Sequence, residues 1–314
     1  MKNKRVAITG ATGFIGANLV HRLCREGYDV YALVRPEADL WRLQHCLHSV
    51  HLATCSLEDP QALELLLTDM RPQILYHLAF PPGYPSSREA QLKMLHSGTV
   101  ETLNILQAAQ KSGVEIFINS GSSTEYGPYP IPMREDLPLK PTTFRGFVKA
   151  SQYLACVYMA RSSGFPVLTM RLFSIFGAWE SGKRLIPTLA LAFLRELPVR
   201  LTEPGIVRDL LFIDDAVDAL LAAPYARFEP GEVVNIGSGR QHRIDEVVEI
   251  FQEVAGKRLT LHPGEYPRQP ADTNHWQADI QRAKTLLGWQ PRYTLADGLR
   301  KTLEWFSSHQ QFYP

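Results

Sequence analysis

The sequence predicts an α/β fold, a doubly wound parallel sheet followed by a smaller α/β lobe toward the C-terminus. Three observations lead to this prediction. Short apolar strands alternate with amphipathic helices in the first half of the chain, as they do in parallel sheets with helices on both faces. A glycine-rich turn joins the first strand to the first helix. Beyond about residue 178, frequent prolines break the chain into shorter pieces.

The elements of the first half follow from apolar periodicity. Arg5–Thr9 is expected to be a buried strand, and residues 14–26 a helix that Gly27 ends. The elements expected next are a strand at Val30–Val34, a helix at Gln61–Asp69, a strand at Ile74–Leu78, a helix at His96–Ser112 and a strand at Ile116–Asn119. The regular alternation predicts that these strands share one sheet.

A proline-rich stretch interrupts this pattern between Gly127 and Thr143, where we expect a loop. A helix at Phe147–Ser163 and a strand at Val167–Phe173 are expected to restore it. We therefore assign residues 1–177 to the main domain and residues 178–314 mainly to the smaller lobe. The stretches 212–222 and 233–237 are apolar enough to return to the main sheet.

The composition restricts the classes of function. The chain has 314 residues, of which 45% are hydrophobic, enough for a large core. Its 33 basic and 32 acidic residues give a net charge of +1, which indicates neither nucleic acid nor a membrane surface as partner. The first apolar run spans only Val6–Ile8, too short for a signal peptide, so a cytoplasmic protein is expected.

Cysteines and histidines give no sign of a metal site. The four cysteines are not spaced as metal ligands and are expected to be reduced thiols. His45, His48 and His51 are spaced as one polar face of a helix. Because a zinc site also needs ligands that converge in space, no metal is predicted.

The glycine-rich turn has the pattern of a dinucleotide site. Gly10 allows a tight reversal, Gly13 lets the backbone approach a pyrophosphate, and Gly16 lets the helix pack close to the sheet. The helix N-terminus then offers free N–H groups to the phosphates. The residues predicted to contact the cofactor here are Gly10, Thr12, Gly13, Phe14, Ile15 and Gly16.

The end of the second strand favours NADP over NAD. Binders of NAD usually place an acid there to accept the ribose 2′-hydroxyl. Here Val34 is followed directly by Arg35. A guanidinium at this point suits a 2′-phosphate, although the same residue also fits a simple solvated charge at a strand end.

Further short motifs follow in order along nearly the whole chain. They are His77–Ala79, Ser122–Gly127, Lys149, Arg171–Gly177, Arg208–Asp215, Asn235–Gly239 and Leu287–Pro291. With the turn at Thr9–Gly16, they resemble the extended short-chain dehydrogenase/reductases, in the branch of sugar-nucleotide epimerases, dehydratases and reductases. The resemblance implies a Rossmann-type NAD(P)-binding domain over residues 1–177 and a C-terminal lobe that binds a nucleoside-diphosphate sugar.

The resemblance also implies residue roles. Ser122 is the expected hydrogen-bond partner of the reacting sugar oxygen. Lys149 is expected to hold the nicotinamide ribose and to assist catalysis, and Leu78 and Ala79 to border the cofactor. Arg208 is the expected partner of the substrate diphosphate, a group that arginine binds well.

The same resemblance indicates two substrate contacts and a homodimer. Ser123 stands where the dehydratases of the family carry the first residue of an Asp-Glu pair, so dehydration by that route is not expected. Ser174 replaces the asparagine of a family motif that contacts the substrate. Many relatives dimerise through helices that correspond to residues 96–112 and 147–163, and a homodimer is expected here.

One position departs from the family pattern. A tyrosine normally stands four residues before the lysine, where it exchanges the hydroxyl proton during hydride transfer. Here Arg145 occupies that position before Lys149. An arginine stays protonated in proteins and is no base, although it can stabilise an oxyanion.

Three explanations of Arg145 are open. Another residue supplies the proton, with Tyr126 as first candidate and Glu125 as second. Alternatively, the chemistry needs no phenol, or redox catalysis has been lost. We therefore expect an NAD(P)-dependent epimerase or 4-ketoreductase of nucleotide sugars with an altered proton-transfer residue. The alternatives are a redox-silent protein that binds a nucleotide sugar or NADP, and an NADP-dependent reductase of a small non-sugar carbonyl.

Overall fold

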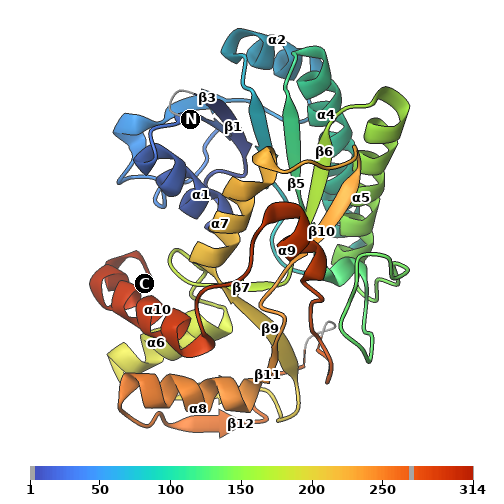
Figure 1. Cartoon of the computed structure of the whole chain (residues 1–314). Helices are drawn as coiled ribbons and strands as arrows, with labels where there is room; N and C mark the ends of the chain where they lie inside the picture. Colours follow the sequence, from blue (N-terminus) through green and yellow to red (C-terminus); the bar gives the residue numbers. More distant parts are fainter. Residues whose placement is uncertain (1–3, 269–271, 314) are drawn as a thin grey trace.

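A parallel sheet of seven strands forms the centre of the molecule in the computed structural model, which describes residues 4–268 and 272–313 (Figure 1). Its order is β10-β6-β5-β4-β1-β2-β3. The strands are β1 (Arg5–Thr9), β2 (Asp29–Val34), β3 (His51–Thr54), β4 (Ile74–His77), β5 (Ile116–Ser122), β6 (Val167–Leu172) and β10 (Glu232–Ile236). The predicted fold class is confirmed. The chain changes direction across the sheet between β1 and β4, and ligands of such sheets bind in the crevice outside that point.

Helices cover both faces of this sheet. The helices are α1 (Phe14–Arg25) and α7 (Ile213–Ala222) on one face, and α2 (Pro60–Met70), α4 (Glu101–Lys111) and α5 (Phe144–Ser163) on the other. The alternation of side chains along β1 explains the two layers. Val6 and Ile8 belong to the hydrophobic cluster of the first face, and Ala7 to that of the second.

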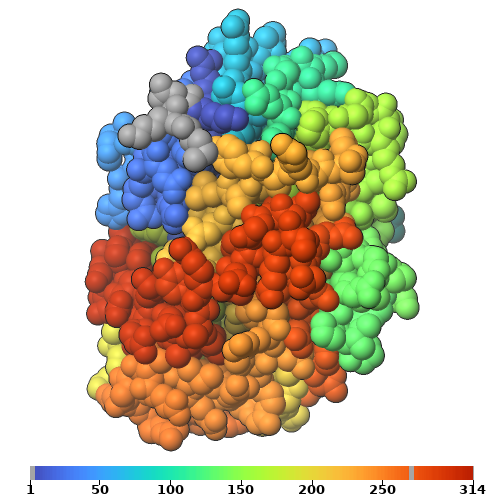
Figure 2. Space-filling view, in the orientation of Figure 1, coloured from blue at the N-terminus to red at the C-terminus, as the bar shows by residue number. Residues whose placement is uncertain are grey.

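The smaller lobe comes mostly from the C-terminal part of the chain. Its helices are α6 (Leu185–Arg195), α8 (Ile244–Ala255) and α10 (Leu295–His309), and α10 packs on the other two. Its strands form two small sheets, one of β7 (Ser174–Phe176), β9 (Val207–Phe212) and β11 (Gln241–Arg243), the other of β8 (Val199–Leu201) and β12 (Leu261–Pro263). In the space-filling view, the orange and red C-terminal segments make up most of the lower half of the visible face (Figure 2).

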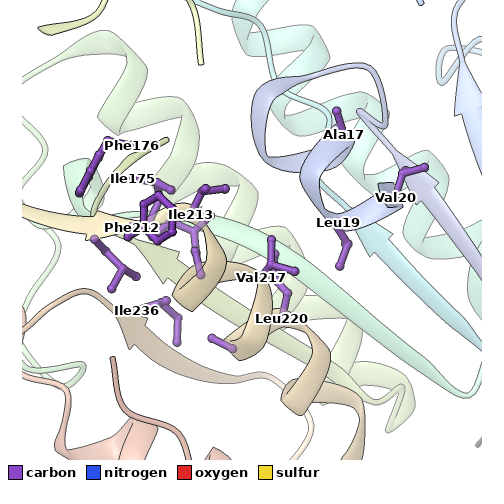
Figure 3. Packing of buried hydrophobic residues seen from close by; sticks show 14 of the residues in the cluster. Ala17, Leu19, Val20, Ile175, Phe176, Phe212, Ile213, Val217, Leu220 and Ile236 are labelled. Carbon is purple, nitrogen blue, oxygen red and sulfur yellow. The ribbon is translucent and has the colours of Figure 1, made fainter. Parts of the chain in front are cut away.

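The two parts share one continuous core. Figure 3 shows Phe176 and Phe212 of the lobe beside Ile213 of α7, in the same cluster as Leu19 of α1. The rings of Phe176 and Phe212 are 5.8 Å apart. Because the cluster runs from α1 into β7 and β9, burial of apolar surface ties the lobe to the half that contains the main sheet. α9 (Gln281–Leu287) packs near β10.

Some boundaries differ from those predicted. Helix α5 begins at Phe144 rather than Phe147, because Thr143 caps it by accepting a hydrogen bond from the Gly146 N–H at 3.0 Å. The helix expected from His96 starts earlier, as α3 (Arg88–Leu95), and passes through a π-helical turn, η2 (His96–Val100), into α4. β3 was not predicted, since this edge strand is mostly exposed and lacks an apolar pattern.

The remaining short elements are η1 (Leu47–Ser49), η3 (Ser123–Glu125), η4 (Ala223–Tyr225) and η5 (Gln310–Phe312). The stretch 212–222, which was expected to be able to return to the main sheet, contains the whole of α7, a helix on one face of that sheet, and 232–236 forms the edge strand β10 beside β6. Within the part of the chain that the structure describes, every helix is too short or too polar to cross a membrane.

Candidate active site

The glycine-rich turn depends on close backbone approach. Gly10 has a φ of +69°, and a Cβ there would lie 2.6 Å from the backbone nitrogen of Ala79. A Cβ on Gly16 would lie 2.1 Å from the Gly10 carbonyl oxygen, so only a glycine lets α1 start this close to the turn. Gly13 is the N-cap of α1 and has no side chain to cap the first turn. The N–H groups of that turn are therefore available to an anion.

Neighbouring segments brace this turn. Thr9, at the end of β1, accepts a hydrogen bond through Oγ1 from the Ala79 N–H at 3.3 Å. The Arg42 guanidinium donates to the Thr12 carbonyl at 3.4 Å and to the Trp179 carbonyl at 2.8 Å. Asn18 of α1 donates to the Ala178 carbonyl at 2.9 Å. These contacts join the turn to the start of the lobe, and sequence patterns gave no sign of Arg42 or Asn18.

The other predicted cofactor residues lie around the same crevice. Phe14 and Ile15 are half-buried in the first turn of α1, and Leu78 is half-buried after β4. Arg35 is exposed and directly follows the last residue of β2. Since β1, β2 and β4 are parallel neighbours, their carboxyl ends place these residues along one edge of the sheet.

Ser122 ends β5, the strand next to β4, and therefore lies at the same edge. Its Oγ lies 2.8 Å from the Thr124 hydroxyl and accepts a hydrogen bond from the Thr124 N–H at 3.2 Å. Ser122 is half-buried, whereas Ser123 is buried and accepts from the Trp276 indole N–H at 3.1 Å. Only the first of these two serines keeps partial exposure toward solvent.

Glu125 and Tyr126, the two proton-transfer candidates, lie in a buried network. The Glu125 carboxylate accepts from the Ser122 N–H at 2.6 Å and from Arg171 Nε at 2.7 Å. The Tyr126 hydroxyl accepts from Arg171 at 2.8 Å and donates to Asn235 Oδ1 at 2.8 Å. Both side chains are 0% exposed. Both side chains are thus hydrogen-bonded inside the protein, and the proton-transfer role that the sequence offered for them as one alternative stays a prediction.

Burial also shifts the titration of this pair. Desolvation raises the pKa of Glu125, and the Arg171 guanidinium opposes that shift. Desolvation likewise raises the pKa of Tyr126 to about 12, again against the effect of Arg171. A phenol with a raised pKa is a poor proton acceptor near neutral pH.

Lys149 is buried at the base of the site, with 3% of its surface exposed. Its ammonium donates to the Ser120 carbonyl at 2.6 Å and to Gln152 Oε1 at 2.7 Å. The Phe80 ring centre lies 4.1 Å from Nζ. Burial, followed by the nearby Arg145 charge, lowers the pKa of Lys149 to about 7.

A line of hydrogen bonds links Lys149 to β1. Gln152 donates a hydrogen bond to Thr102 Oγ1 at 3.2 Å, and the same oxygen lies 3.0 Å from His77 Nε2. The other ring nitrogen, His77 Nδ1, lies 2.8 Å from Thr9 Oγ1. Burial lowers the pKa of His77 to about 3, so the ring is neutral. The Thr102 hydroxyl donates to a carbonyl of the preceding turn at 3.0 Å. His77 must therefore carry its proton on Nε2 and accept the Thr9 hydroxyl on Nδ1.

Arg145 lies in the first turn of α5 and reaches the loop that follows β4. Its guanidinium donates to the Pro81 carbonyl at 2.7 Å and to the Gly83 carbonyl at 3.5 Å. It also stacks on Phe80, 4.6 Å from the ring centre. Burial lowers the pKa of Arg145, and Tyr84 acts in the opposite direction. The Arg145 side chain is thus hydrogen-bonded to the loop that follows β4.

Phe80 fits here because Gly98 leaves room for it. A Cβ on Gly98, in the π-helical turn, would lie 2.2 Å from Val148 Cγ1 and 3.0 Å from the Phe80 ring. Phe80 then touches both cations, Arg145 and Lys149. Neither Phe80 nor Gly98 was singled out from the sequence. The one available signal was that an aromatic residue directly follows the His77–Ala79 motif.

The predicted substrate residues of the lobe lie on paired strands. Ser174 begins β7, which pairs with β9, and Arg208 lies on β9. Arg208 forms an ion pair with Asp272 and donates to the Val207 carbonyl at 2.7 Å. Next to it, Asp209 is buried and has a pKa raised to about 6 by desolvation. A diphosphate would compete with Asp272 for the Arg208 guanidinium.

Among the described residues, His45, His48 and His51 do not belong to any group whose ligand atoms lie close together. His45 lies in an aromatic cluster, 6.0 Å from the Trp179 ring and 6.2 Å from that of Phe312. A different group, formed by Glu58, His96 and Glu101, has ligand atoms within 4.8 Å of one another. Two of these three residues are exposed, as solvated charges commonly are.

Known proteins share this architecture over its full length. Residues 6–237 match the model of the NAD dependent epimerase/dehydratase family, and the chain belongs to that family. UDP-glucose 4-epimerase of Azospirillum brasilense is 27% identical over 98% of this chain and 93% of its own length. A solved UDP-glucose 4-epimerase from Thermotoga maritima, with UDP-glucose, is 26% identical with a TM-score of 0.88, covering 98% and 99% of the two chains. UDP-glucuronic acid 4-epimerase from Bacillus cereus, in complex with UDP-glucuronic acid and NAD, is 25% identical with a TM-score of 0.87, covering 98% and 100%.

Proposed function

We propose that this member of the NAD dependent epimerase/dehydratase family modifies a nucleoside-diphosphate sugar by reversible oxidation of one of its hydroxyl carbons. The observation that carries the proposal is the shared edge of the sheet. Gly10, Ser122 and Lys149 lie at or beside the carboxyl ends of neighbouring strands. A dinucleotide held at the turn would extend along this edge toward the serine and the lysine.

The residues present fit a nicotinamide dinucleotide. Gly10 and Gly16 let the backbone of the turn pack against residues 78–79 and against the start of α1, and the first turn of α1 has no side-chain cap from Gly13, which leaves its N–H groups available to a pyrophosphate. When bound, the nicotinamide ring supplies the site for hydride transfer. Ser122 would hold the reacting sugar oxygen, and Lys149 the nicotinamide ribose. Arg208 would bind the diphosphate of the sugar nucleotide, as the resemblance implies.

The choice between NADP and NAD depends on Arg35. Its exposed position after β2 supports NADP, because a guanidinium there can pair with a 2′-phosphate. The Bacillus cereus relative binds NAD. Calorimetric titration of both cofactors into wild type and Arg35→Ala tests this choice. A preference for NADP that the variant loses by about 10-fold supports it, and tighter binding of NAD by the wild type contradicts it.

A homodimer is proposed from an exposed apolar stripe on α5 and the neighbouring η2–α4 helix. Phe147, Leu154 and Tyr158 are 45%, 58% and 62% exposed, and Val100 is 42% exposed. Their spacing places the three α5 residues on one face of the helix. Sedimentation equilibrium of wild type and Leu154→Glu tests the interface. A wild type that stays monomeric at micromolar concentration would rule it out.

One feature favours a second candidate, a protein that binds its ligands without redox turnover. The Phe80 ring covers the Lys149 ammonium, and Arg145 is tied to the loop rather than free in the site. Such a protein would bind the cofactor and leave the sugar unchanged.

Product analysis separates the two candidates. Purified protein is incubated with UDP-glucose, UDP-glucuronic acid and 4-keto sugar nucleotides, each with NAD or NADP, and the products are resolved by chromatography and NMR. A changed sugar, dependent on the cofactor and lost in Ser122→Ala, supports the enzyme. Tight cofactor binding with every sugar unchanged supports the redox-silent protein and overturns the proposed function.

A further inference from the structure

The loop after β4 carries an exposed phenol, Tyr84. The loop leaves β4 at His77, and the strand beside β4 is β5, which ends at Ser122. Because both strands are parallel, the loop and Ser122 emerge at the same edge of the sheet. Tyr84 is 39% exposed, so its side chain is partly open to solvent on this loop.

Arg145 connects this loop to the segment that follows Ser122. Its neighbour Gly146 packs so tightly on η3 that a Cβ would lie 2.3 Å from the Thr124 carbonyl oxygen. Thr124 is in turn hydrogen-bonded to Ser122. From this anchored position, the Arg145 guanidinium donates to the carbonyls of Pro81 and Gly83. The clamp therefore fixes the backbone immediately before Tyr84.

The local backbone stiffens the same stretch. Prolines at 81, 82 and 85 restrict φ, and Gly83, with a φ of +77°, turns the chain between them. Tyr84 opposes the lowering of the Arg145 pKa by burial. Arg145, at the position where the resemblance leads us to expect a tyrosine, thus holds the backbone directly before another phenol.

We propose that Tyr84 is the catalytic proton-transfer residue of this chain and that Arg145 is its positioning residue. The proposal rests on the proposed function. The Tyr84 phenolate would take the proton of the sugar hydroxyl while the C–H of the same carbon leaves as hydride to the oxidised nicotinamide. The C–O single bond becomes a carbonyl, and Tyr84 holds the proton as a neutral phenol. Return of both to the carbonyl restores the hydroxyl, on either face of the sugar carbon.

The other candidate groups are engaged elsewhere. The Tyr126 hydroxyl is 0% exposed and bound to Arg171 and Asn235. Both oxygens of the Glu125 carboxylate accept internal hydrogen bonds. The Lys149 ammonium has two internal acceptors and lies under Phe80. Tyr84 combines partial exposure with a place on the loop that Arg145 holds.

Kinetics on three variants test the role of Tyr84. Tyr84→Phe is expected to lower kcat by about 10²- to 10⁴-fold, with KM changed less than about threefold because sugar binding does not need the proton. The matched control is Tyr225→Phe, which removes a similarly exposed phenol (44%) at the opposite edge of the sheet and should leave kcat unchanged. Restoring the family's phenol in Arg145→Tyr/Tyr84→Phe should recover part of the lost kcat.

A second measurement does not depend on turnover. In the cofactor-loaded protein labelled with [¹³Cζ]tyrosine, the Tyr84 signal is assigned by its loss in Tyr84→Phe. Addition of UDP-glucose or UDP-glucuronic acid should shift that signal and leave the signal of Tyr225 in place. A Tyr84 signal that ignores every sugar nucleotide bound by the protein would show that the phenol does not touch substrate, and the proposal would be overturned.

The outcomes also separate the two proposals. If wild type turns over a sugar nucleotide and Tyr84→Phe keeps its kcat, the role of Tyr84 is overturned and the proposed function stands. If neither protein turns over any substrate, both proposals are overturned together. A kcat loss confined to Tyr84→Phe, with unchanged thermal unfolding and cofactor affinity, supports both.

Discussion

The two ends of the crevice are built in different ways. At the glycine turn, the geometry comes from backbone, because Gly10 and Gly16 sit where any Cβ would collide. At the other end of the crevice, the hydroxyl end formed by Phe80, Ser122, Arg145 and Lys149, the geometry comes from side chains. Arg145 and Lys149 both lie against the Phe80 ring. A backbone site tolerates almost no substitution. A side-chain site can be rebuilt by compensating changes, and the departure from the family pattern that the sequence leads us to expect lies at this second end.

The hydroxyl end depends on contacts between residues that are distant in the sequence. Phe80 has room only because position 98 is a glycine, and it stacks on Arg145, which stands where the resemblance leads us to expect a tyrosine. Below these residues, the Gln152, Thr102 and His77 line continues to β1. Lys149 is therefore connected to the start of the glycine turn through buried polar groups.

The largest effect is expected at the glycine turn. Gly10→Ala should cost about 4 kcal/mol of unfolding free energy, from left-handed backbone strain and collision with Ala79. Gly27→Ala is the matched control, since its φ is +81° with open space around it; it should cost about 1 kcal/mol. Urea unfolding of both variants measures the difference. Equal losses would show that close approach does not matter at the turn.

A somewhat smaller effect is expected from the buried ion pair under Ser122. Glu125→Gln leaves the Arg171 charge poorly compensated in the interior and should cost about 3 kcal/mol. The control, Glu64→Gln, breaks an exposed pair with Lys111 and should cost less than about 1 kcal/mol. Thermal and urea unfolding test the pair, and a loss for Glu125→Gln no larger than the control's would contradict the network.

Lys149 gives a pH dependence to the apoprotein. Its folded pKa of about 7 lies below the ordinary lysine pKa of 10.5, so the unfolded chain binds more protons between these pH values. Stability from this group should rise with pH across that window, by at most about 1.4 kcal/mol per pH unit. Urea unfolding of wild type and Lys149→Met between pH 7 and 9 measures the slope. An equally steep rise in the variant would assign it to other groups.

The smallest effect is expected from a variant that tests whether Tyr126 has a structural or a catalytic role. Tyr126→Phe removes a hydroxyl shared by Arg171 and Asn235 and should cost about 1 kcal/mol of stability. Because that hydroxyl is buried, kcat at a temperature well below unfolding should stay within about twofold of wild type. A drop in kcat as large as that expected for Tyr84→Phe would indicate that Tyr126, rather than Tyr84, is the proton-transfer residue.

Sequence patterns predicted the main sheet and the glycine turn because both depend on residues that are close together in the sequence. Strand–helix periodicity gave the main sheet, and the spacing of Gly10, Gly13 and Gly16 gave the turn. The hydroxyl end was harder, since its contacts join β4, the π-helical turn and α5 across long separations. Arg145 was recognised as a departure, but its acceptors on Pro81 and Gly83 depend on tertiary packing.

The role of Tyr126 shows the same limit. Its position after Ser122 made it the first proton-transfer candidate, whereas the structure buries its hydroxyl between Arg171 and Asn235. No local pattern reports which way a loop side chain turns. Asp209, with four internal donors on Ser238, Gly239 and Ala278, was unrecognised for the same reason.

The central claim is that the hydroxyl end performs redox chemistry with an arginine at position 145. Single-turnover absorbance at the reduced-nicotinamide band tests it most directly, with cofactor-loaded wild type and Arg145→Tyr mixed with UDP-glucose or UDP-glucuronic acid. A transient rise and fall in wild type, at least as large as in the variant, is the predicted result. A signal that appears only in Arg145→Tyr would contradict the claim and show that the arginine had abolished the reaction.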